Sequence, residues 1–270
     1  AANSKAIKMT AFTELGLDAP IVTALKTKGY SIPTPIQLQA IPIVLQGRDL
    51  CGIAQTGTGK TAAFALPAIQ RLKDSNRPTL PAACRMLILS PTRELASQIA
   101  LSCKAYSKNY HLSVAVVFGG VPINRQIKTL SKGIDILVAT PGRLLDLIEQ
   151  RALNLRSVEI FVLDEADQML DLGFIHDLKR IDQLLPKPRQ TLFFSATMPK
   201  SISELGNRFL RPDAVRVAVA PPATTAERVD QYVSFVNQRE KQALLSLTLK
   251  NQEIERALIF TRTKHGADKI

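Results

Sequence analysis

Cysteine and histidine are scarce in this sequence, and neither is clustered. The 270 residues contain three of each. Cys51, Cys84 and Cys103 are widely spaced beside apolar runs, a pattern that fits neither a disulfide framework nor a metal site. The histidines are equally scattered, which argues against a metal site built on imidazole ligands. Unpaired cysteines favour a reducing compartment, and we expect the cytoplasm.

Long apolar runs are missing as well. The longest runs, such as Val114–Phe118 and Ile160–Leu163, are far shorter than a membrane span. The N-terminus has no signal-peptide core, and the chain has no internal repeat or low-complexity segment. We therefore expect a globular protein that makes no membrane contact.

Positive charge, by contrast, is in excess. Lys and Arg number 35 against 23 acidic residues, which gives a formal net charge of +12. Such a surplus favours a polyanionic partner. Lys and Arg are attracted to phosphates, and their binding releases the counterions that the phosphates hold. A basic, solvated surface would explain the same charge, so the composition leaves both explanations open. The hydrophobic content of 46% allows a sizeable core.

Short β-rich runs alternate with longer helical stretches. The predicted strands are Leu50–Ala54, Met86–Ser90, Ser113–Phe118, Ile134–Ala139, Ile160–Leu163 and Thr191–Phe194. The predicted helices between them include Thr61–Leu72, Arg93–Asn109, Arg143–Gln150 and Asp177–Leu185. Strands apolar on both faces predict a parallel sheet covered by helices on both sides. Ligands of such sheets bind at the carboxyl ends of the strands.

The pattern changes after residue 209. Pro212, Pro221 and Pro222 make Arg211–Thr225 look like a linker. Beyond it we predict a strand at Gln231–Val236, a helix at Lys241–Leu249 and a strand at Ala257–Phe260. This last part is too short to cover both faces of a second α/β domain.

A small-residue loop follows the first strand and opens a helix. It reads Ala54-Gln55-Thr56-Gly57-Thr58-Gly59-Lys60-Thr61. Backbone N–H groups of such a loop and the helix N-terminus can surround phosphates. Lys60 would hold the β- and γ-phosphates, and Thr61 would ligate Mg²⁺. Ala54 stands where the strict pattern has glycine, but the strand and helix around the loop still indicate an NTP site.

A second acidic element follows the strand Ile160–Leu163. It reads Asp164-Glu165-Ala166-Asp167. The strand would deliver Asp164 to the Mg²⁺ shell, partly through water, and Glu165 to the water that attacks the phosphate. Acids after an apolar run are usually only a strand end meeting solvent, but the phosphate loop elsewhere in the chain favours the catalytic interpretation.

Asp164-Glu165-Ala166-Asp167 spells the motif that names the DEAD-box RNA helicases, and the chain from about residue 10 to residue 270 resembles that family. The resemblance implies an adenine-recognition element at Gly29–Gln37, with an isolated aromatic, Phe12, before it. By this resemblance Gln37 reads adenine, Tyr30 stacks on it, the Ile32 backbone contacts it and Phe12 packs nearby.

Three further motifs, each after a strand, match positions with which the family grips one RNA strand. They are Pro91-Thr92-Arg93, Gly119-Gly120 and Thr140-Pro141-Gly142-Arg143. The resemblance implies sequence-independent contacts to the sugar–phosphate backbone, including 2′-hydroxyls. Any one of these motifs alone could be only a turn and a helix cap.

Ser195-Ala196-Thr197 resembles the family motif that bonds the acidic segment and couples hydrolysis to strand separation, with Asp167 as the partner. A simple cap of the following helix is the alternative. Phe118–Val121, Asp171–Asp177 and Phe260–Gly266 look most like the bacterial RhlE-type subgroup.

The resemblance implies a RecA-like P-loop NTPase domain with an incomplete second RecA-like domain. We predict an adenine-recognition segment at 1–40, the ATP-binding domain at 41–216, a linker at 217–225 and the start of the second domain at 226–270. The family's arginine-rich motif of the second domain is not found here, so we infer a fragment.

Two functions therefore stay open for this polypeptide. One is the core of an ATP-dependent RNA helicase that unwinds short duplexes, and the other is a nucleotide-binding module with little catalysis of its own. A DNA helicase is a weaker alternative. The expected ligands are ATP, Mg²⁺ and RNA, and the expected partners are the missing domain and factors of ribosome assembly or RNA decay.

Overall fold

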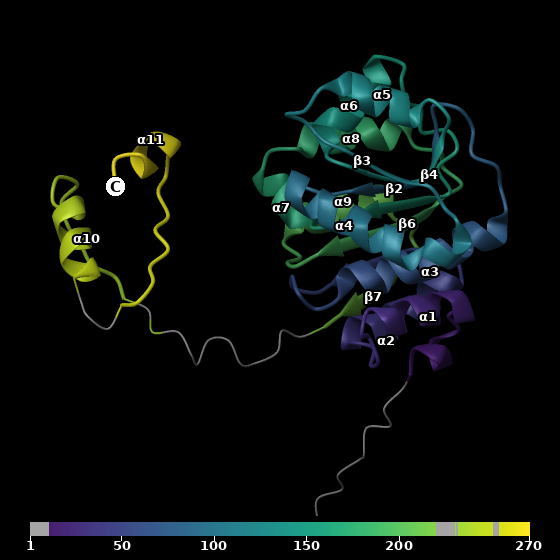
Figure 1. Ribbon diagram of the computed structural model, residues 1–270, viewed down its shortest axis with the longest axis horizontal. Helices are drawn as coiled ribbons and strands as arrows, with labels where there is room; N and C mark the ends of the chain where they lie inside the picture. Colours follow the sequence, from purple (N-terminus) through teal and green to yellow (C-terminus); the bar gives the residue numbers. More distant parts are fainter. Residues whose placement is uncertain (1–10, 220–229, 231, 251–253) are drawn as a thin grey trace, which may run out of the picture. The chain divides into compact units, whose positions relative to one another are not determined.

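The computed structural model describes residues 11–219, 230, 232–250 and 254–270. It divides into two compact units, residues 1–221 and 222–270. The first unit is built on a parallel sheet in the order β3-β4-β2-β5-β6-β1-β7 (Figure 1). Its strands are β1 (Leu50–Ile53), β2 (Cys84–Leu89), β3 (Val114–Val117), β4 (Ile134–Ala139), β5 (Ile160–Leu163), β6 (Gln190–Ser195) and β7 (Val215–Ala218).

Helices connect these strands. They are α1 (Ala19–Thr27), α2 (Pro35–Leu45), α3 (Lys60–Ser75), α4 (Arg93–Tyr106), α5 (Ile123–Leu130), α6 (Pro141–Glu149), α7 (Ala166–Asp171), α8 (Ile175–Leu184) and α9 (Lys200–Phe209), with short 3₁₀ turns at Phe12–Leu15 and Lys108–Tyr110. Local sequence sets several starts: proline occupies the first turn of α2 and α6, and the Thr92 hydroxyl caps α4.

Alternating strand residues fill two separate cores, one on each face of the sheet. Met86, Ile88 and Val162 pack under α1 to α4. Leu87, Leu89 and Phe161 point the other way and pack under α5 to α9. The strands are apolar on both sides because both faces are covered, as the sequence predicted.

The predicted strands and helices of this unit are confirmed, with ends that differ by a few residues. One strand was missed. Val215–Ala218 falls in the stretch 211–225 that we expected to be a linker, but it forms β7 and pairs in parallel with β1. It is a short edge strand that buries only Val217, so its apolar signal is weak beside the neighbouring prolines.

The second unit is described by itself. Its predicted helix at Lys241–Leu249 is confirmed as α10, and a short helix α11 covers Lys264–Ala267. The two predicted strands are not found: 232–236 and 257–260 are irregular, while residue 231 lies outside the described residues. Phe235 and Phe260 are exposed by 99% and 86%. A strand needs a pairing partner, and neither segment has one among the described residues.

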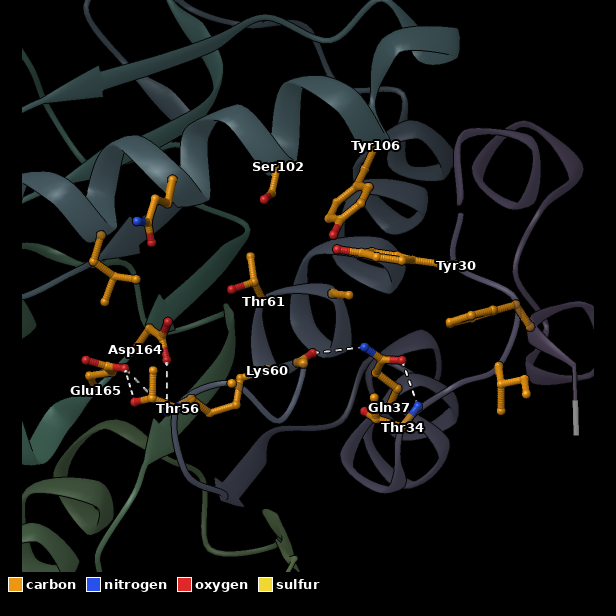
Figure 2. A pocket seen from close by; sticks show the side chains of 17 residues that line it. Tyr30, Thr34, Gln37, Thr56, Lys60, Thr61, Ser102, Tyr106, Asp164 and Glu165 are labelled. Carbon is orange, nitrogen blue, oxygen red and sulfur yellow. Dashed lines mark hydrogen bonds and ion pairs between the residues drawn. The ribbon is translucent and has the colours of Figure 1, made fainter. Parts of the chain in front are cut away.

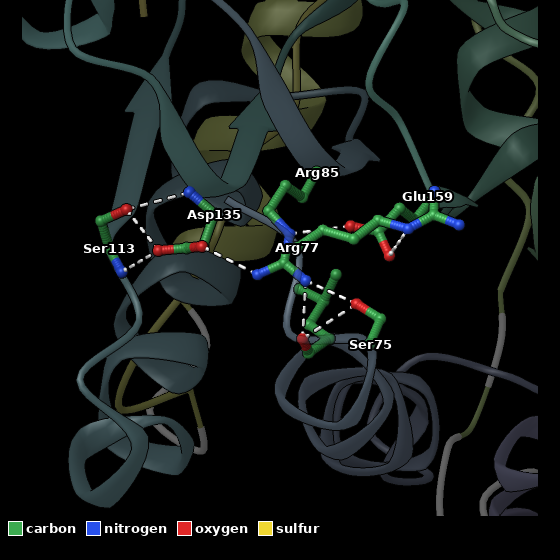
Figure 3. Close-up of polar contacts among 7 residues, drawn as sticks. Ser75, Arg77, Arg85, Ser113, Asp135 and Glu159 are labelled. Atoms are coloured by element: carbon green, nitrogen blue, oxygen red, sulfur yellow. Dashed lines mark hydrogen bonds and ion pairs between the residues drawn. The ribbon is translucent and has the colours of Figure 1, made fainter. Parts of the chain in front are cut away.

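Charged residues form a bonded network at the amino edge of the sheet. Arg85, at the start of β2, is buried and donates to the carboxylates of Glu159 at 2.7 Å and Asp135 at 3.1 Å. Its remaining donors reach Leu72 O and Ser75 Oγ, both at 2.6 Å (Figure 3). This network joins β2 to the C-terminal end of α3 and to the residue before β5.

Asp49, just before β1, makes a second junction at the same edge. Its carboxylate accepts hydrogen bonds from Thr191 N, Arg211 N and Arg211 Nη2, each at 2.9 Å. These bonds join the starts of β1 and β6 to the segment that leads into β7.

Among the described helices, none is long and apolar enough to cross a membrane.

Candidate nucleotide and nucleic-acid site

The strand order brings the two predicted phosphate-handling motifs together. The loop after β1 and the acidic residues after β5 lie at the same edge, with only β6 between them. Thr56 Oγ1, in the loop, donates to Glu165 Oε1 at 2.8 Å. Segments that are far apart in the sequence thus form one site at the carboxyl ends of the strands.

The loop at 54–61 has the backbone that phosphate binding requires. Gly57 and Gly59 have positive φ values of 86° and 93°, which residues with a Cβ rarely adopt. A Cβ on Gly59 would also lie 2.5 Å from Gln37 Nε2. Lys60 and Thr61 then begin α3, so the positive end of the helix dipole faces this loop.

Two oppositely charged groups inside the site each have one buried atom without a hydrogen bond. The Lys60 side chain is 5% exposed, and its Nζ lies 3.7 Å from Glu165 Oε1 and 4.0 Å from Asp164 Oδ1. Lys60 Nζ and Asp164 Oδ1 are both buried without a hydrogen-bond partner in the described part of the chain. Such groups cost free energy unless a ligand engages them, so they favour a bound polar species.

The environment of Asp164 is unfavourable for its charge. Burial raises the pKa of Asp164 to about 6, against a lowering by Lys60 and a further increase from Glu165. Glu165 itself has a left-handed backbone with φ of 55° and is the N-cap of α7. Strained backbone and a perturbed carboxyl group at one cleft are typical of functional sites.

The predicted adenine element lies beside the loop. The Gln37 amide is 4% exposed; its Oε1 accepts from Thr34 N at 2.9 Å, and its Nε2 donates to Gly59 O at 3.1 Å. Each of these amide atoms can still make one further hydrogen bond. Gln37 therefore joins the start of α2 to the phosphate loop and retains the capacity to contact a base.

These elements line one cavity of about 500 Å³ (Figure 2). Phe12, Tyr30, Ile32 and Gln37 line one part of it, and the loop with Asp164 and Glu165 lines another. Phe12 is buried, whereas Tyr30 and Ile32 are exposed by 44% and 54%. The volume is in the range of small-molecule sites.

The sequence analysis missed one wall of this cavity, which α4 supplies. Leu95, Gln98, Ser102 and Tyr106 line it. Figure 2 shows the hydroxyl of Tyr30 directed toward Tyr106, whose pKa is raised by burial and then by Tyr30. The spacing of these four residues, three or four apart, places them on one helix face and was the available signal.

The residues present suit Mg²⁺ together with a phosphate ligand. Mg²⁺ takes oxygen ligands from one or two protein groups and keeps several waters. Asp164 offers a buried carboxylate oxygen with no partner among the described residues, and Thr61 lines the same cavity. This donor set fits the predicted metal ligands.

The three predicted RNA-binding motifs meet at the ends of neighbouring strands β3, β4 and β2. The Arg93 guanidinium carbon lies 5.0 Å from the ring centre of Phe118, and a Cβ on Gly120 would lie 2.5 Å from Arg93 Nη1. Arg143 donates through Nη1 and Nη2 to Val121 O, both at 3.2 Å. Two arginines therefore flank the Gly119-Gly120 turn.

The helix-cap explanation holds for part of these motifs. The Thr92 hydroxyl accepts from Leu95 N at 3.2 Å, which makes it a true N-cap. Thr140 precedes α6 without a side-chain cap bond. Pro91, Thr140 and Pro141 are buried, whereas Arg93, Gly120 and Gly142 are exposed and available to a ligand.

Thr197 contacts the acidic segment rather than capping α9. Its N and Oγ1 both donate to Asp167 Oδ2 at 3.0 Å. Burial raises the pKa of Asp167, but hydrogen bonds, first those from Thr197, hold it below its usual value. Ser195, at the end of β6, is buried. The structure thus joins Thr197 and Asp167 as the sequence predicted.

Comparison with known proteins points to one family. The chain is 44% identical to the ATP-dependent RNA helicase CshA of Listeria monocytogenes over 97% of this chain and 49% of that protein. It is 44% identical to the RNA helicase CrhR of Synechocystis over 95% and 51% of the two chains. The chain therefore spans about half the length of these curated relatives. These names do not confirm the expected RhlE-type subgroup.

A solved structure agrees with these relatives. A DEAD box protein from Methanococcus jannaschii superimposes with a TM-score of 0.71 at 38% identity, covering 96% of this chain and 68% of that one. A family model described as DEAD/DEAH box helicase matches residues 34–205, which include the whole nucleotide loop, the acidic motif and Thr197. With the RecA-like sheet and the cavity at its carboxyl edge, these matches lead to one conclusion: the chain belongs to the DEAD/DEAH box helicase family.

Proposed function

We propose that this chain carries the ATP-binding and RNA-gripping part of an ATP-dependent RNA helicase. The observation that supports this most directly is the single cavity lined by Gln37, Lys60 and Asp164. It combines a group suited to a base, a buried ammonium suited to phosphates and a buried carboxylate suited to a metal.

Each residue has a role that follows from its surroundings. Lys60 Nζ, without a hydrogen bond among the described residues, binds the β- and γ-phosphates of ATP. Asp164 and Thr61 would hold Mg²⁺, which would supply positive charge to the phosphates. Glu165 orients and polarises the attacking water, because Thr56 fixes one carboxylate oxygen and leaves the other for that water.

Adenine selectivity rests on Gln37. An amide that both donates and accepts matches the N6 and N7 edge of adenine and mismatches guanine. The bonds to Thr34 N and Gly59 O fix its orientation before the base arrives. Tyr30 stacks on the base, with Phe12 and the Ile32 backbone beside it.

RNA binds through its backbone at the loops after β2, β3 and β4. The residues assigned to it are Pro91, Thr92, Arg93, Gly119, Gly120, Thr140, Pro141, Gly142 and Arg143. Exposed guanidinium and backbone N–H groups at helix starts suit phosphates and carry no base code, so binding is independent of sequence. The bond between Thr197 and Asp167 joins the segment after β6 to the acidic segment of the nucleotide site.

Catalysis by these 270 residues alone is expected to be weak. No arginine lines the nucleotide cavity in the part of the chain that the structure describes. An arginine near the γ-phosphate can raise the rate of phosphoryl transfer by about 10³-fold or more. We propose that a second domain supplies this group, so the chain by itself is a nucleotide-binding module.

The test is ATP turnover by this chain with and without single-stranded RNA, beside Lys60→Ala and Glu165→Gln. We expect little turnover, Mg-nucleotide binding in the unsubstituted chain and in Glu165→Gln, and loss of binding in Lys60→Ala. Turnover that rises with RNA and vanishes in both variants would show that the chain is catalytic alone. Nucleotide binding that survives in Lys60→Ala would contradict the site itself.

The physiological setting follows from weaker observations. The described cysteines are free and buried, which fits a reducing compartment such as the cytoplasm. Ribosome-assembly or RNA-decay factors remain our proposed partners. A CshA-like assignment accounts for the relatives found better than the RhlE-type subgroup does.

A further inference from the structure

A second polar cavity lies at the amino edge of the sheet, at the opposite ends of the strands from the nucleotide site. It has a volume of about 330 Å³ and lies between the end of α3 and the residues before β1, β5, β6 and β7. Four arginines line it: Arg71, Arg77, Arg189 and Arg211. No residue of the proposed nucleotide or RNA sites is among its described lining.

The carboxylates near this cavity are already engaged. Glu159, the acidic residue that lines it, accepts from buried Arg85 at 2.7 Å and lies 3.8 Å from Arg77 (Figure 3). Asp49 is bonded to Arg211 at 2.9 Å, and Asp182 is shared by Arg189 and Arg208 at 3.4 and 3.0 Å. Positive charge therefore exceeds negative charge around the cavity.

Among the arginines that line the cavity, Arg71 has few hydrogen bonds to balance its charge. Its Nη1 donates to Leu45 O at 3.1 Å, its buried Nε has no partner, and its Nη2 makes no hydrogen bond to any described residue. It forms no ion pair with a described carboxylate. Burial lowers the pKa of Arg71, the charges of Asp74 and Glu159 raise it, and the charge of Arg211 lowers it. Arg71 and Arg211 therefore line the same cavity, in which Glu159 is the acidic lining residue.

The backbone keeps this space accessible. Gly47 has a positive φ of 75°, and a Cβ there would lie 3.0 Å from both Nη atoms of Arg71. Glycine lets the backbone pass beside the guanidinium group without displacing it. Arg77, with a side chain 72% exposed, stands at the rim, where it can close over a ligand.

We propose that this cavity binds a compact phosphate anion, of the size of inorganic diphosphate, between Arg71, Arg77 and Arg211. Guanidinium groups present parallel N–H donors that match phosphate oxygens two at a time. The volume lies at the small end of ligand sites, so it suits a diphosphate group rather than a polypeptide segment. An anion here would offset the repulsion between Arg71 and Arg211.

The experiment is a titration of the ¹⁵N-labelled chain with inorganic diphosphate, followed by amide chemical shifts. Diphosphate also binds the phosphate loop, but the two sites report on different amides: Gly47 and Gln190 for the arginine cavity, Gly57 and Lys60 for the loop. The variants are Arg77→Gln, which alters an exposed side chain, and Arg71→Gln combined with Arg77→Gln. Arg156→Gln, an exposed arginine outside the cavity, is the matched control.

We expect saturable shifts at Gly47 and Gln190. Affinity should fall about tenfold for each guanidinium removed and stay unchanged in Arg156→Gln, because charge-assisted hydrogen bonds have about this strength. The loop amides should respond equally in all variants, which also shows that each variant is folded. Equal affinity in the double variant, or no response at Gly47 and Gln190 while the loop saturates, would overturn the proposal.

A second arm distinguishes the sources of phosphate. A short single-stranded RNA without terminal phosphates is titrated in place of diphosphate. Shifts at Gly47 and Gln190 that appear with RNA and not with diphosphate would replace the small anion with a nucleic-acid backbone. Equal shifts with sodium chloride at matched ionic strength would mean that the shifts come from screening of charges by salt and not from binding. That result would also overturn the proposal.

Discussion

At the amino edge of the sheet, buried Arg85 makes four hydrogen bonds and meets two carboxylates. At the carboxyl edge, buried Lys60 makes none with described residues and lies 3.7 Å or more from its two carboxylates. The same fold thus satisfies buried charge at one edge and leaves it unsatisfied at the other. Satisfied charges hold the strands in place, and unsatisfied charges are available to a ligand.

The largest expected loss of stability comes from removing Arg85, the centre of the hydrogen-bonded network at the amino edge. Arg85→Met leaves Glu159 and Asp135 partly buried without their main partner. Removing one member of a buried ion network costs about 3–5 kcal/mol of unfolding free energy. Urea-induced unfolding measures it. Arg156→Met, at an exposed position, is the control and should change stability by less than about 0.5 kcal/mol. A loss below about 1 kcal/mol for Arg85→Met would show that the network is not structural.

Removing the charge of Asp164 at the carboxyl edge should raise the free energy of unfolding, whereas Arg85→Met lowers it. The pKa of Asp164 is raised to about 6 in the fold, from 3.8. Between these values the folded state keeps a proton that the unfolded state has lost, so stability falls as the pH rises through this window and stays lower above it. At about 1.4 kcal/mol per unit, the penalty near neutral pH reaches about 3 kcal/mol.

Asp164→Asn removes that penalty. We expect the variant to match the parent near pH 4 and to exceed its unfolding free energy by up to about 3 kcal/mol at pH 7.5. Chemical unfolding at several pH values measures the difference, and Asp171→Asn, at an exposed position, is the matched control. A variant that is less stable than the parent at pH 7.5 would mean that Lys60 needs the carboxylate more than burial opposes it.

A smaller effect is expected at the link between the acidic motif and Thr197. Thr197→Val removes the hydroxyl bond to Asp167 Oδ2 and keeps the backbone bond. The pKa of Asp167, held low in the fold, should rise, and stability should fall by about 1 kcal/mol at neutral pH. This stabilisation is present above the unfolded pKa of Asp167 and is lost as the pH drops through the folded one.

The measurement for this variant is the pH titration of the Asp167 carboxyl carbon by NMR. Thr129→Val, which removes an exposed hydroxyl bonded to Arg125 O, controls for the loss of a threonine. An unchanged Asp167 pKa would assign its low value to Ser195 and the backbone donors instead.

The smallest effect concerns two buried thiols. Burial raises the pKa of Cys84 and of Cys103 to about 12. The reactive thiolate is therefore almost absent at pH 8, and a disulfide reagent should label these cysteines only after unfolding. Fast labelling of the native chain, followed by absorbance, would contradict the packing of these two residues.

The contrast between the edges also explains what the sequence could predict. The carboxyl edge carries contiguous motifs, such as residues 54–61 and 164–167, whose spacing fits a strand followed by a loop. The contribution of α4 to the cavity was missed because Gln98 and Ser102 have the composition of an ordinary exposed helix face. Only the structure shows that they line the cavity. The arginines that line the amino-edge cavity come one at a time from separate segments. No local sequence pattern predicts that they lie together.

The strands show the same limit. β4 and β5 were predicted with their observed ends because β5 is a continuous apolar run and β4 is apolar apart from Asp135. β7 was missed because its pairing with β1, and not its own composition, makes it a strand. Conversely, 257–260 has a strand-like composition and no partner among the described residues, so composition alone was insufficient.

The pairing of β7 with β1 also has a mechanical side. Directly after β7, Val219 N donates a hydrogen bond to Ile53 O at 2.9 Å. Ile53 is the final residue of the strand that opens into the phosphate loop. Tension on the chain beyond residue 219 would load these bonds first, in shear, and would reach the nucleotide loop before any other part of the sheet.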